Sequence, residues 1–257
     1  MNLWNTYIYI PLVNAFVLLY QYLPFFKLPL AIFLLTILIR TLVFPLTKKS
    51  MDQSRAMQKI QPEVKKLQQK YKGNPQKLNE EQMKLFAKNK VNPASGCLFS
   101  LVQFPLIIAL YPVFMNLSKQ SFDGFFGYYQ VLNPLIRFEH FNSILYSFVP
   151  KLTYVNFHFL IWELSRPDPN FILPIIAGAL QYVQARQMIT KTNDETQKTM
   201  NQTMLFMPLL IILFAGNLAA SVALYWIAAT IVGIIQTAII KRSSHDHKLA
   251  DTSKRSK

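Results

Sequence analysis

The sequence predicts an all-α polytopic membrane protein with five transmembrane helices, an N-terminal interfacial helix and a cytosolic helical hairpin. Hydrophobic residues make up 52% of the 257 residues, and they gather in runs of the length that crosses a bilayer. The basic residues concentrate in segments between these runs. The predicted spans cover residues 28–47, 97–117, 171–189, 202–218 and 222–240.

Residues 1–27 are expected to form an interfacial amphipathic helix. Their aromatic side chains favour the headgroup boundary of a membrane: Trp4, Tyr7, Tyr9, Tyr20 and Tyr22. Pro11 and Pro24 bracket only about 12 residues, too few to cross a bilayer. A sixth span is the competing interpretation. A removable signal peptide is not expected, because a basic start and a small-residue cleavage site are missing.

The first predicted span, residues 28–47, carries a full positive charge at Arg40. Placing an arginine in the middle of a membrane helix costs at least about 2.5–3.5 kcal/mol, so such a charge usually marks function. The alternative is that Arg40 extends its side chain toward the membrane surface near Lys48, about 12 Å along the helix. The span alone leaves both interpretations open.

Residues 48–92 form a basic segment with twelve Lys or Arg and four acidic residues, a net charge of +8. Apolar residues recur at spacings of four, three and four from Ile60 to Tyr71, which predicts a helix. Lys72-Gly-Asn-Pro75 ends this helix, and further apolar positions predict a second one. The segment is therefore predicted to be a cytosolic helical hairpin.

The remaining connections differ in charge. Residues 118–170 are neutral and rich in aromatics, which suits an extracytoplasmic segment with amphipathic or short reentrant helices. Residues 190–201 are predicted to be a cytosolic loop. Residues 241–257 form a basic cytosolic tail with a net charge of +4, and we expect it to be disordered. Because basic residues stay on the cytoplasmic side, the N-terminus is expected outside and the C-terminus inside.

The sequence offers no catalytic or metal-binding set. Its single cysteine, Cys97, excludes an internal disulfide framework, and His245 and His247 lie in the tail. Nucleophile elbows, phosphate-binding loops and zinc-binding helices are missing. We therefore expect neither enzymatic activity nor a cofactor or metal.

Polar side chains on the spans are the remaining candidates for a site. Thr36 lies one helical turn before Arg40 and shares its face. Gln103 lies on the second predicted span, and Gln181 and Gln184 lie on the third. Each alone is more often a contact between helices. Because the five predicted spans contain no acidic residue, these groups together suggest a polar cavity in which Arg40 meets water, carbonyls or a passing anionic group.

Several motifs resemble the YidC/Oxa/Alb family of membrane protein insertases. The first span resembles the family's first core span in Leu35–Arg40 and in Phe44-Pro-Leu-Thr-Lys-Lys49. The second span is similar in Gly96-Cys-Leu98, Gln103-Phe-Pro105 and Ala109-Leu-Tyr111. The last two spans are similar in Met207-Pro208, Ala223-Leu-Tyr-Trp226 and Ile235-Gln236. The resemblance covers roughly residues 28–117 and 171–240, and it fits the short bacterial form in the plasma (inner) membrane.

The resemblance implies an insertase and chaperone with a hydrated, positively charged groove. Six residues would line it: Arg40, Thr36, Gln103, Gln181, Tyr225 and Trp226. The groove would receive nascent membrane proteins and release their hydrophobic segments laterally, alone or with the Sec translocon. The other expected partners are the ribosome, targeting factors and anionic lipids. Binding to a specific nucleic acid sequence is not expected.

Two further classes of protein remain open from the sequence. A small-molecule transporter or channel predicts internal repeats with paired broken helices, and the two halves of this chain show no such pairing. A scaffold that assembles membrane complexes overlaps with the insertase.

Overall fold

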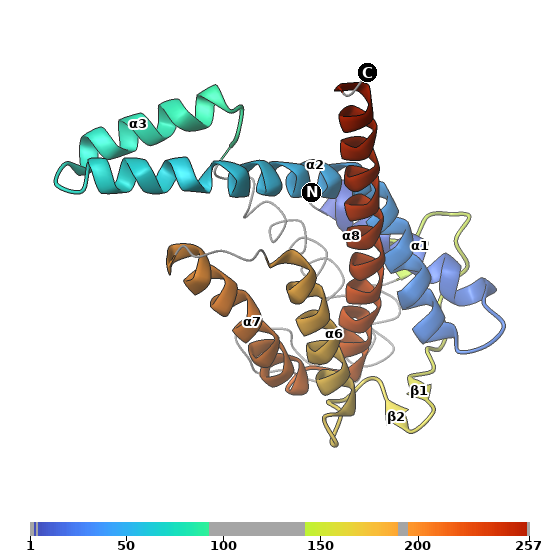
Figure 1. Cartoon of the computed structure of the whole chain (residues 1–257). Coiled ribbons are helices and arrows are strands. Elements are labelled where there is room, and N and C mark those ends of the chain that lie inside the picture. The colour runs from blue at the N-terminus through green and yellow to red at the C-terminus, as the bar shows by residue number, and fades with distance from the viewer. Residues whose placement is uncertain (1–2, 4, 93–141, 190–194, 256–257) are drawn as a thin grey trace. The chain divides into compact units, whose positions relative to one another are not determined.

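A computed structural model describes residue 3 and residues 5–92, 142–189 and 195–255 (Figure 1). It divides into two compact units. Unit 1 comprises Met1–Thr41 and Ile108–Lys257, and unit 2 comprises Leu42–Ile107. The fold is mainly helical, as the sequence predicts.

The chain starts with a short π-helix, Asn5–Tyr9, followed by helix α1, Ile10–Tyr22. Pro11 lies in the first turn of α1, where its missing N–H costs no helical hydrogen bond. At 13 residues α1 has the short length expected between Pro11 and Pro24. Its location at the membrane surface stays a prediction.

Helix α2 runs without interruption from Lys27 to Lys70, through the predicted boundary between the first span and the basic segment. Pro45 and Pro62 both lie inside it. The polar stretch that follows Thr47 lacks glycine and is rich in lysine, glutamine and methionine, which favour helix. The change in composition at Lys48 is therefore a change of surroundings along one helix.

Unit 2 contains the second part of α2 and helix α3, Pro75–Lys88. Asn74 caps α3 by accepting a hydrogen bond of 3.1 Å from the Lys77 backbone N–H. A small apolar core joins the two helices, and it consists of Ala56, Met57, Ile60, Val64, Leu85, Phe86 and Val91. The basic segment thus folds as helix, turn and helix around its own core.

Residues 142–170 differ from the short helices expected there, and the fold is not purely α. Strands β1 (His158–Phe159) and β2 (Trp162–Glu163) form a two-residue antiparallel hairpin. Side chains distant in sequence hold the rest of the segment: Asn14 accepts a hydrogen bond from the Tyr146 N–H, and the Tyr20 hydroxyl accepts one from Asn156 N–H. These bonds take the place of the regular backbone hydrogen bonds of a helix. No periodic pattern in the sequence therefore predicts them.

Three helices complete unit 1: α6 (Ile172–Met188), α7 (Glu195–Gly216) and α8 (Ala220–Arg255). Helix α6 packs against both α7 and α8 (Figure 1). The buried Asp168 carboxylate accepts hydrogen bonds from the Asn170 and Leu173 N–H groups and thereby caps the start of α6. The first N–H groups of α8 donate to the carbonyls of Arg166 and Leu164.

Two boundaries at the C-terminal end differ from the sequence predictions. Helix α7 starts at Glu195, inside the predicted cytosolic loop 190–201. The prediction that the tail 241–257 is disordered is wrong, because α8 continues to Arg255. The tail contains neither glycine nor proline, so nothing in it forces α8 to end at Lys241.

Within the described residues, two helices have the length and apolar composition to cross a membrane: α2, and α8 over Ala220–Arg242. Helix α7 has a shorter apolar stretch, Asn201–Gly216, and α6 has 17 residues. The predicted second span, 97–117, lies outside the described residues. The number of five spans therefore stays a prediction.

Candidate functional site

Arg40 lies in unit 1, where α2 meets α8. Its side chain is buried, with 7% of its surface exposed. The Gln236 side chain donates from Nε2 to the Arg40 backbone carbonyl over 2.9 Å, although the two residues are 196 positions apart. This bond fixes the α2 turn that carries the charge against α8.

Tyr225 shares the face of α8 that carries Gln236. Eleven residues rotate an α-helix by about 1,100°, only about 20° beyond three full turns. Tyr225 is buried and interacts electrostatically with Arg40. One face of α8 thus contacts Arg40 in two ways. The Tyr225 phenol interacts with the Arg40 side chain, and the Gln236 amide bonds to the Arg40 backbone.

Thr36 occupies the turn of α2 before Arg40 and is also buried. Its hydroxyl donates a hydrogen bond of 2.6 Å to the Ile32 carbonyl of the same helix. Such a bond satisfies the hydroxyl within an apolar helix. Thr36 therefore lies beside Arg40, with its proton engaged by α2 itself.

Gln181 and Trp226 belong to the contact between α6 and α8. The Thr230 hydroxyl lies 3.2 Å from the Gln181 Oε1 and 2.8 Å from the Trp226 carbonyl. It carries one proton and donates to one of these acceptors at a time. When it donates to Gln181, it joins the two helices one turn after Trp226.

The predicted site residues thus fall on two adjacent contacts of α8. Arg40, Thr36 and Tyr225 lie at the contact with α2, while Gln181 and Trp226 lie at the contact with α6. Gln103 lies outside the described residues. The part of each residue in binding a client protein stays a prediction.

Two further buried amides lie on these helices, and one atom of each has no hydrogen-bond partner among the described residues. They are Gln184 Nε2 on α6 and Gln236 Oε1 on α8. Gly233 makes room for the Gln184 amide, which would overlap a Cβ at that position. Buried polar atoms without partners are uncommon and mark a polar site inside the helices.

Sequence reasoning named Gln236 only within a resembling motif and passed over Thr230. The spacing of eleven residues from Tyr225 places Gln236 on the same face of α8, but it does not indicate a contact with Arg40. Thr230 lies one turn after Trp226, so the spacing of four residues was its signal.

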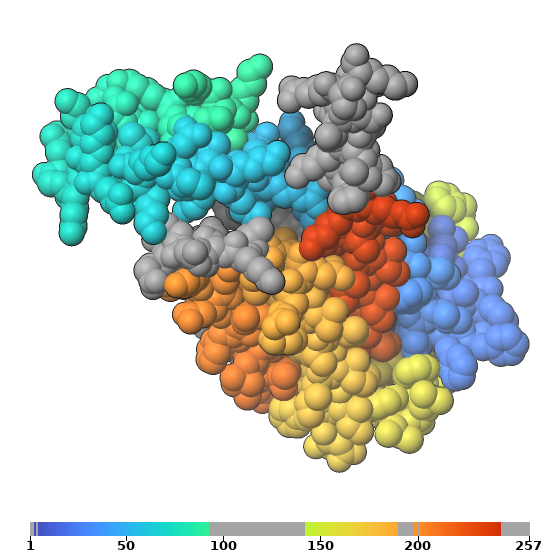
Figure 2. Space-filling model, in the orientation of Figure 1, coloured from blue at the N-terminus to red at the C-terminus, as the bar shows by residue number. Residues whose placement is uncertain are grey.

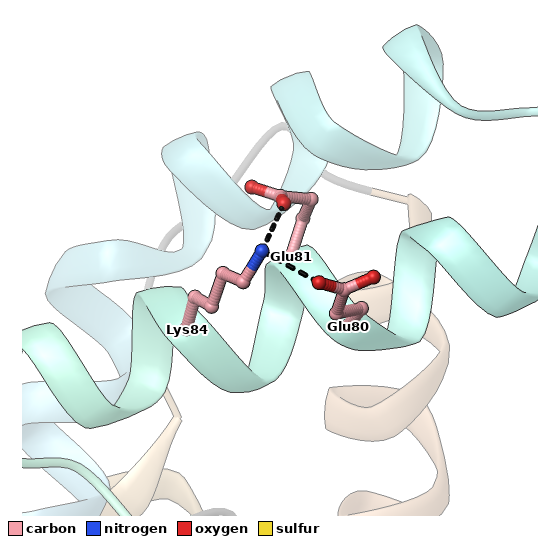
Figure 3. A network of polar contacts seen from close by, with 3 residues as sticks. All are labelled: Glu80, Glu81 and Lys84. Atoms are coloured by element: carbon pink, nitrogen blue, oxygen red, sulfur yellow. Dashed lines mark hydrogen bonds and ion pairs between the residues drawn. The ribbon is translucent and has the colours of Figure 1, made fainter.

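Unit 2 offers a second candidate surface, with exposed side chains along α2 and α3 (Figure 2). Lys84 contacts Glu80 at 2.6 Å and Glu81 at 2.8 Å on the surface of α3 (Figure 3). The hydrogen bond from Lys84 lowers the pKa of the Glu80 carboxyl, and the bonds to Glu80 and Glu81 raise the pKa of Lys84. The network supports α3 near neutral pH and is lost when the pH falls through the lowered pKa of Glu80 or rises through the raised pKa of Lys84. Its exposure keeps this contribution small.

The two span-length helices among the described residues, with Arg40 buried where they meet, are consistent with a helical membrane protein. The sequence matches the family described as 60Kd inner membrane protein over residues 18–248. It is 30% identical to the membrane protein insertase YidC of Clostridium tetani over 242 residues, 92% of this chain and 94% of that protein.

Two further relatives carry similar names. The membrane protein insertase MisCA of Bacillus subtilis is 36% identical over 216 residues, 82% of this chain and 69% of that protein. The membrane protein insertase YidC 2 of Bacillus anthracis is 32% identical over 244 residues, 93% of this chain and 82% of that protein. The chain therefore belongs to the YidC/Oxa family of membrane protein insertases, and the resemblance found in its motifs is confirmed. Membership supports membrane protein insertion as its general function, with nascent membrane proteins as clients.

Proposed function

We propose that this chain inserts nascent membrane proteins through a hydrated groove inside the membrane, where Arg40 provides a fixed positive charge. The observation that carries the proposal is the placement of Arg40, buried at the contact of α2 with α8 beside Tyr225 and Gln236. A buried charge is costly unless its surroundings compensate it. Tyr225 of α8 interacts electrostatically with Arg40, and water in the proposed groove would add to this compensation.

The charge would act on the polar part of a client. A nascent protein has to move a hydrophilic terminus across the membrane, and an acidic or polar terminus would be held transiently at Arg40. A groove that carries water to half the depth of the bilayer shortens the dehydrated path and lowers the desolvation cost. The membrane potential adds a driving force for charged termini.

The hydrophobic part of the client would leave sideways along α6 and α8. Both helices carry exposed apolar side chains that suit sliding contact with a hydrophobic segment and with lipid: Ile175, Ile176, Tyr182 and Val183 on α6, and Ile235 and Ile239 on α8. Burial of the client segment in lipid would make its release favourable.

The proposal includes five spans in a bacterial plasma membrane, with the N-terminus outside and unit 2 and the tail in the cytoplasm. The net charge of +8 on residues 48–92 suits contact with ribosomal RNA, targeting factors or anionic lipids. Cooperation with the Sec translocon would extend the range of clients.

The test compares Arg40→Lys with Arg40→Ala in proteoliposomes that receive a client with an acidic N-terminal tail. We expect Arg40→Lys to insert the client and Arg40→Ala to show a partial loss. If the charge of residue 40 stabilises the bound acidic tail by about 1–2 kcal/mol, its loss lowers insertion by about 5- to 30-fold. Protease protection of the client tail measures insertion.

A client with a neutral tail serves as the control, and its insertion should depend little on residue 40. Equal insertion of the acidic client by both variants would overturn the charge-based role and leave Arg40 as an arginine that extends to the membrane surface.

A further inference from the structure

A cluster of exposed and half-buried aromatic and aliphatic side chains lies where α2 begins. We call it the aromatic tip, and it consists of Phe25, Phe26, Phe159, Leu160, Ile161 and Trp162. We propose that the aromatic tip inserts into the headgroup and upper acyl region of the membrane leaflet at which α2 and α8 begin. It would thereby fix the depth of these two helices in the bilayer.

The β1–β2 hairpin changes polarity over a single pair of residues. At its base His158 pairs with Glu163, with 3.3 Å between Nε2 and Oε2, and the Ser165 hydroxyl donates to the same carboxylate over 2.6 Å. At the next pair Phe159 stacks on Trp162, and the turn beyond presents Leu160 and Ile161, which are 68% and 75% exposed. The hairpin thus has a polar base and an apolar end.

The aromatic tip continues onto the residues that precede α2. The Phe26 ring meets the Phe159 ring edge to face, with 5.5 Å between the ring centroids. Phe25 and Phe26 are 72% and 57% exposed, although both are large and apolar. A contiguous exposed apolar patch indicates an interaction surface, whereas single exposed apolar residues are common on any protein.

Two independent contacts place the aromatic tip at the starts of α2 and α8. The Phe26 contact ties it to Lys27, the first residue of α2, and the carbonyls of Leu164 and Arg166 accept hydrogen bonds from the first N–H groups of α8. Among the described residues, α2 and α8 are the helices that have the length and composition to cross a membrane. Figure 1 shows β1 and β2 near the end of unit 1 at which α6 and α8 begin.

The chemistry of the aromatic tip fits a lipid surface. Phenylalanine and tryptophan favour the region between headgroups and acyl chains, and aliphatic side chains favour the acyl chains below. Lys27 lies next to Phe26 and would meet lipid phosphates at the same depth. The polar base of the hairpin would remain among headgroups and water.

The test measures how deeply the aromatic tip lies in a membrane. In a Cys97→Ser background, Ile161→Cys carries a fluorescent probe, and the purified full-length chain is placed in nanodiscs of phosphatidylcholine and phosphatidylglycerol. Lipids with a nitroxide high on the acyl chain should quench the probe, and iodide in the buffer should quench it weakly. Leu160→Cys gives a second position with the same expectation.

Two further labelled positions serve as references for a probe in water and for a probe deep in the membrane. Lys72→Cys lies in the exposed turn of unit 2 and should respond to iodide only. Leu209→Cys, exposed near the middle of the apolar stretch of α7, should respond best to a nitroxide deeper in the acyl chain. An unchanged thermal unfolding midpoint shows that each variant remains folded.

The proposal is overturned if the probe at Ile161 responds to iodide as strongly as the probe at Lys72. It is also overturned if neither iodide nor nitroxide lipid quenches it, because a second copy of the chain would then cover the aromatic tip. Both outcomes leave the proposed role of Arg40 intact, since no client is present.

Discussion

At the scale of single residues, one amide joins the two span-length helices at the charge. Gln236 donates to the backbone carbonyl of Arg40 and therefore holds the position of residue 40 whatever its side chain does. The oxygen of this amide, Oε1, is buried without a hydrogen-bond partner among the described residues. The amide is thus poised to accept a further hydrogen bond beside the charge.

Replacement of Gln236 by leucine should loosen α2 from α8. Hydrogen bonds between helices inside membranes are worth about 0.6 kcal/mol on average and up to about 1.7 kcal/mol. We expect a lower thermal unfolding midpoint in detergent and a smaller loss of insertion for Gln236→Leu than for Arg40→Ala. Thr230→Val, which removes a hydroxyl from the other contact of α8, is the control. A full loss of insertion with an unchanged midpoint would assign Gln236 to client binding instead.

Arg40 could be found from the sequence because a charge interrupts a long apolar run. Its partner Gln236 could not be identified in the same way, because a bond to a backbone carbonyl imposes no residue type on the other helix. The hydrogen bond from Thr36 to the Ile32 carbonyl could not be predicted either, since a threonine in an apolar span looks the same whether it bonds within its own helix or across to another.

At the scale of elements, glycines allow α6 to lie close to both of its neighbours. A Cβ added to Gly178 would overlap the Ile212 side chain and approach the Pro208 carbonyl of α7 to 3.2 Å. On the other side, Gly233 of α8 receives the Gln184 amide. Small residues at helix contacts permit such close approach in membrane proteins.

Gly178→Ala should therefore separate α6 from α7. Added volume in a packed contact costs about 1–3 kcal/mol, and the rigid Pro208 carbonyl limits relief by side-chain movement. We expect a lower thermal unfolding midpoint in detergent. Gly73→Ala is the matched control, because nothing lies within 4 Å of its added Cβ. Equal midpoints for the two variants would contradict close packing at Gly178.

Among the described residues, helices lie over the hydrophobic runs, whereas several helix ends differ from those expected. Helix α2 continues through Pro45, Pro62 and the lysines around them, and no glycine occurs before Gly73 to favour a C-terminal cap. Helix α8 extends into the basic tail for the same reason. Composition predicts where a helix changes surroundings more reliably than where it stops.

At the scale of the whole molecule, α1 is tied to a segment more than a hundred residues later. Asn14 donates to the Ile144 carbonyl over 3.2 Å and accepts from the Tyr146 N–H over 2.6 Å. Tyr20 adds the bond from Asn156, and burial is the main cause that raises the pKa of its phenol. These contacts give residues 142–156 a fixed course without regular secondary structure.

Asn14→Leu should release this segment while leaving the helices in place. The variant loses both bonds and leaves two backbone groups to find water, at about 1–3 kcal/mol per group if they stay buried. We expect faster proteolysis within residues 142–156 and an unchanged helical circular dichroism signal. Gln21→Ala, which removes a longer bond of 3.3 Å to the Lys151 carbonyl, should have a smaller effect. Equal proteolysis of Asn14→Leu and the unmodified chain would contradict the tie to α1.

The mainly helical architecture was predictable because apolar runs of membrane length leave few other structures. The course of residues 142–170 was not, since it depends on single side chains such as Asn14 and Asp168 that bond to backbone groups far along the chain or at the next helix start. The same limit applies to the placement of Gln181 and Tyr225 on separate contacts of α8.

The distance in sequence between Arg40 and Gln236 also orders events during biogenesis. A ribosome adds about 5–20 residues per second, so the 196 positions between them take about 10–40 seconds to synthesise. For most of that time Arg40 is already made while α8, which supplies Tyr225 and Gln236, does not yet exist. The contact between Arg40 and α8 can therefore form only near the end of synthesis.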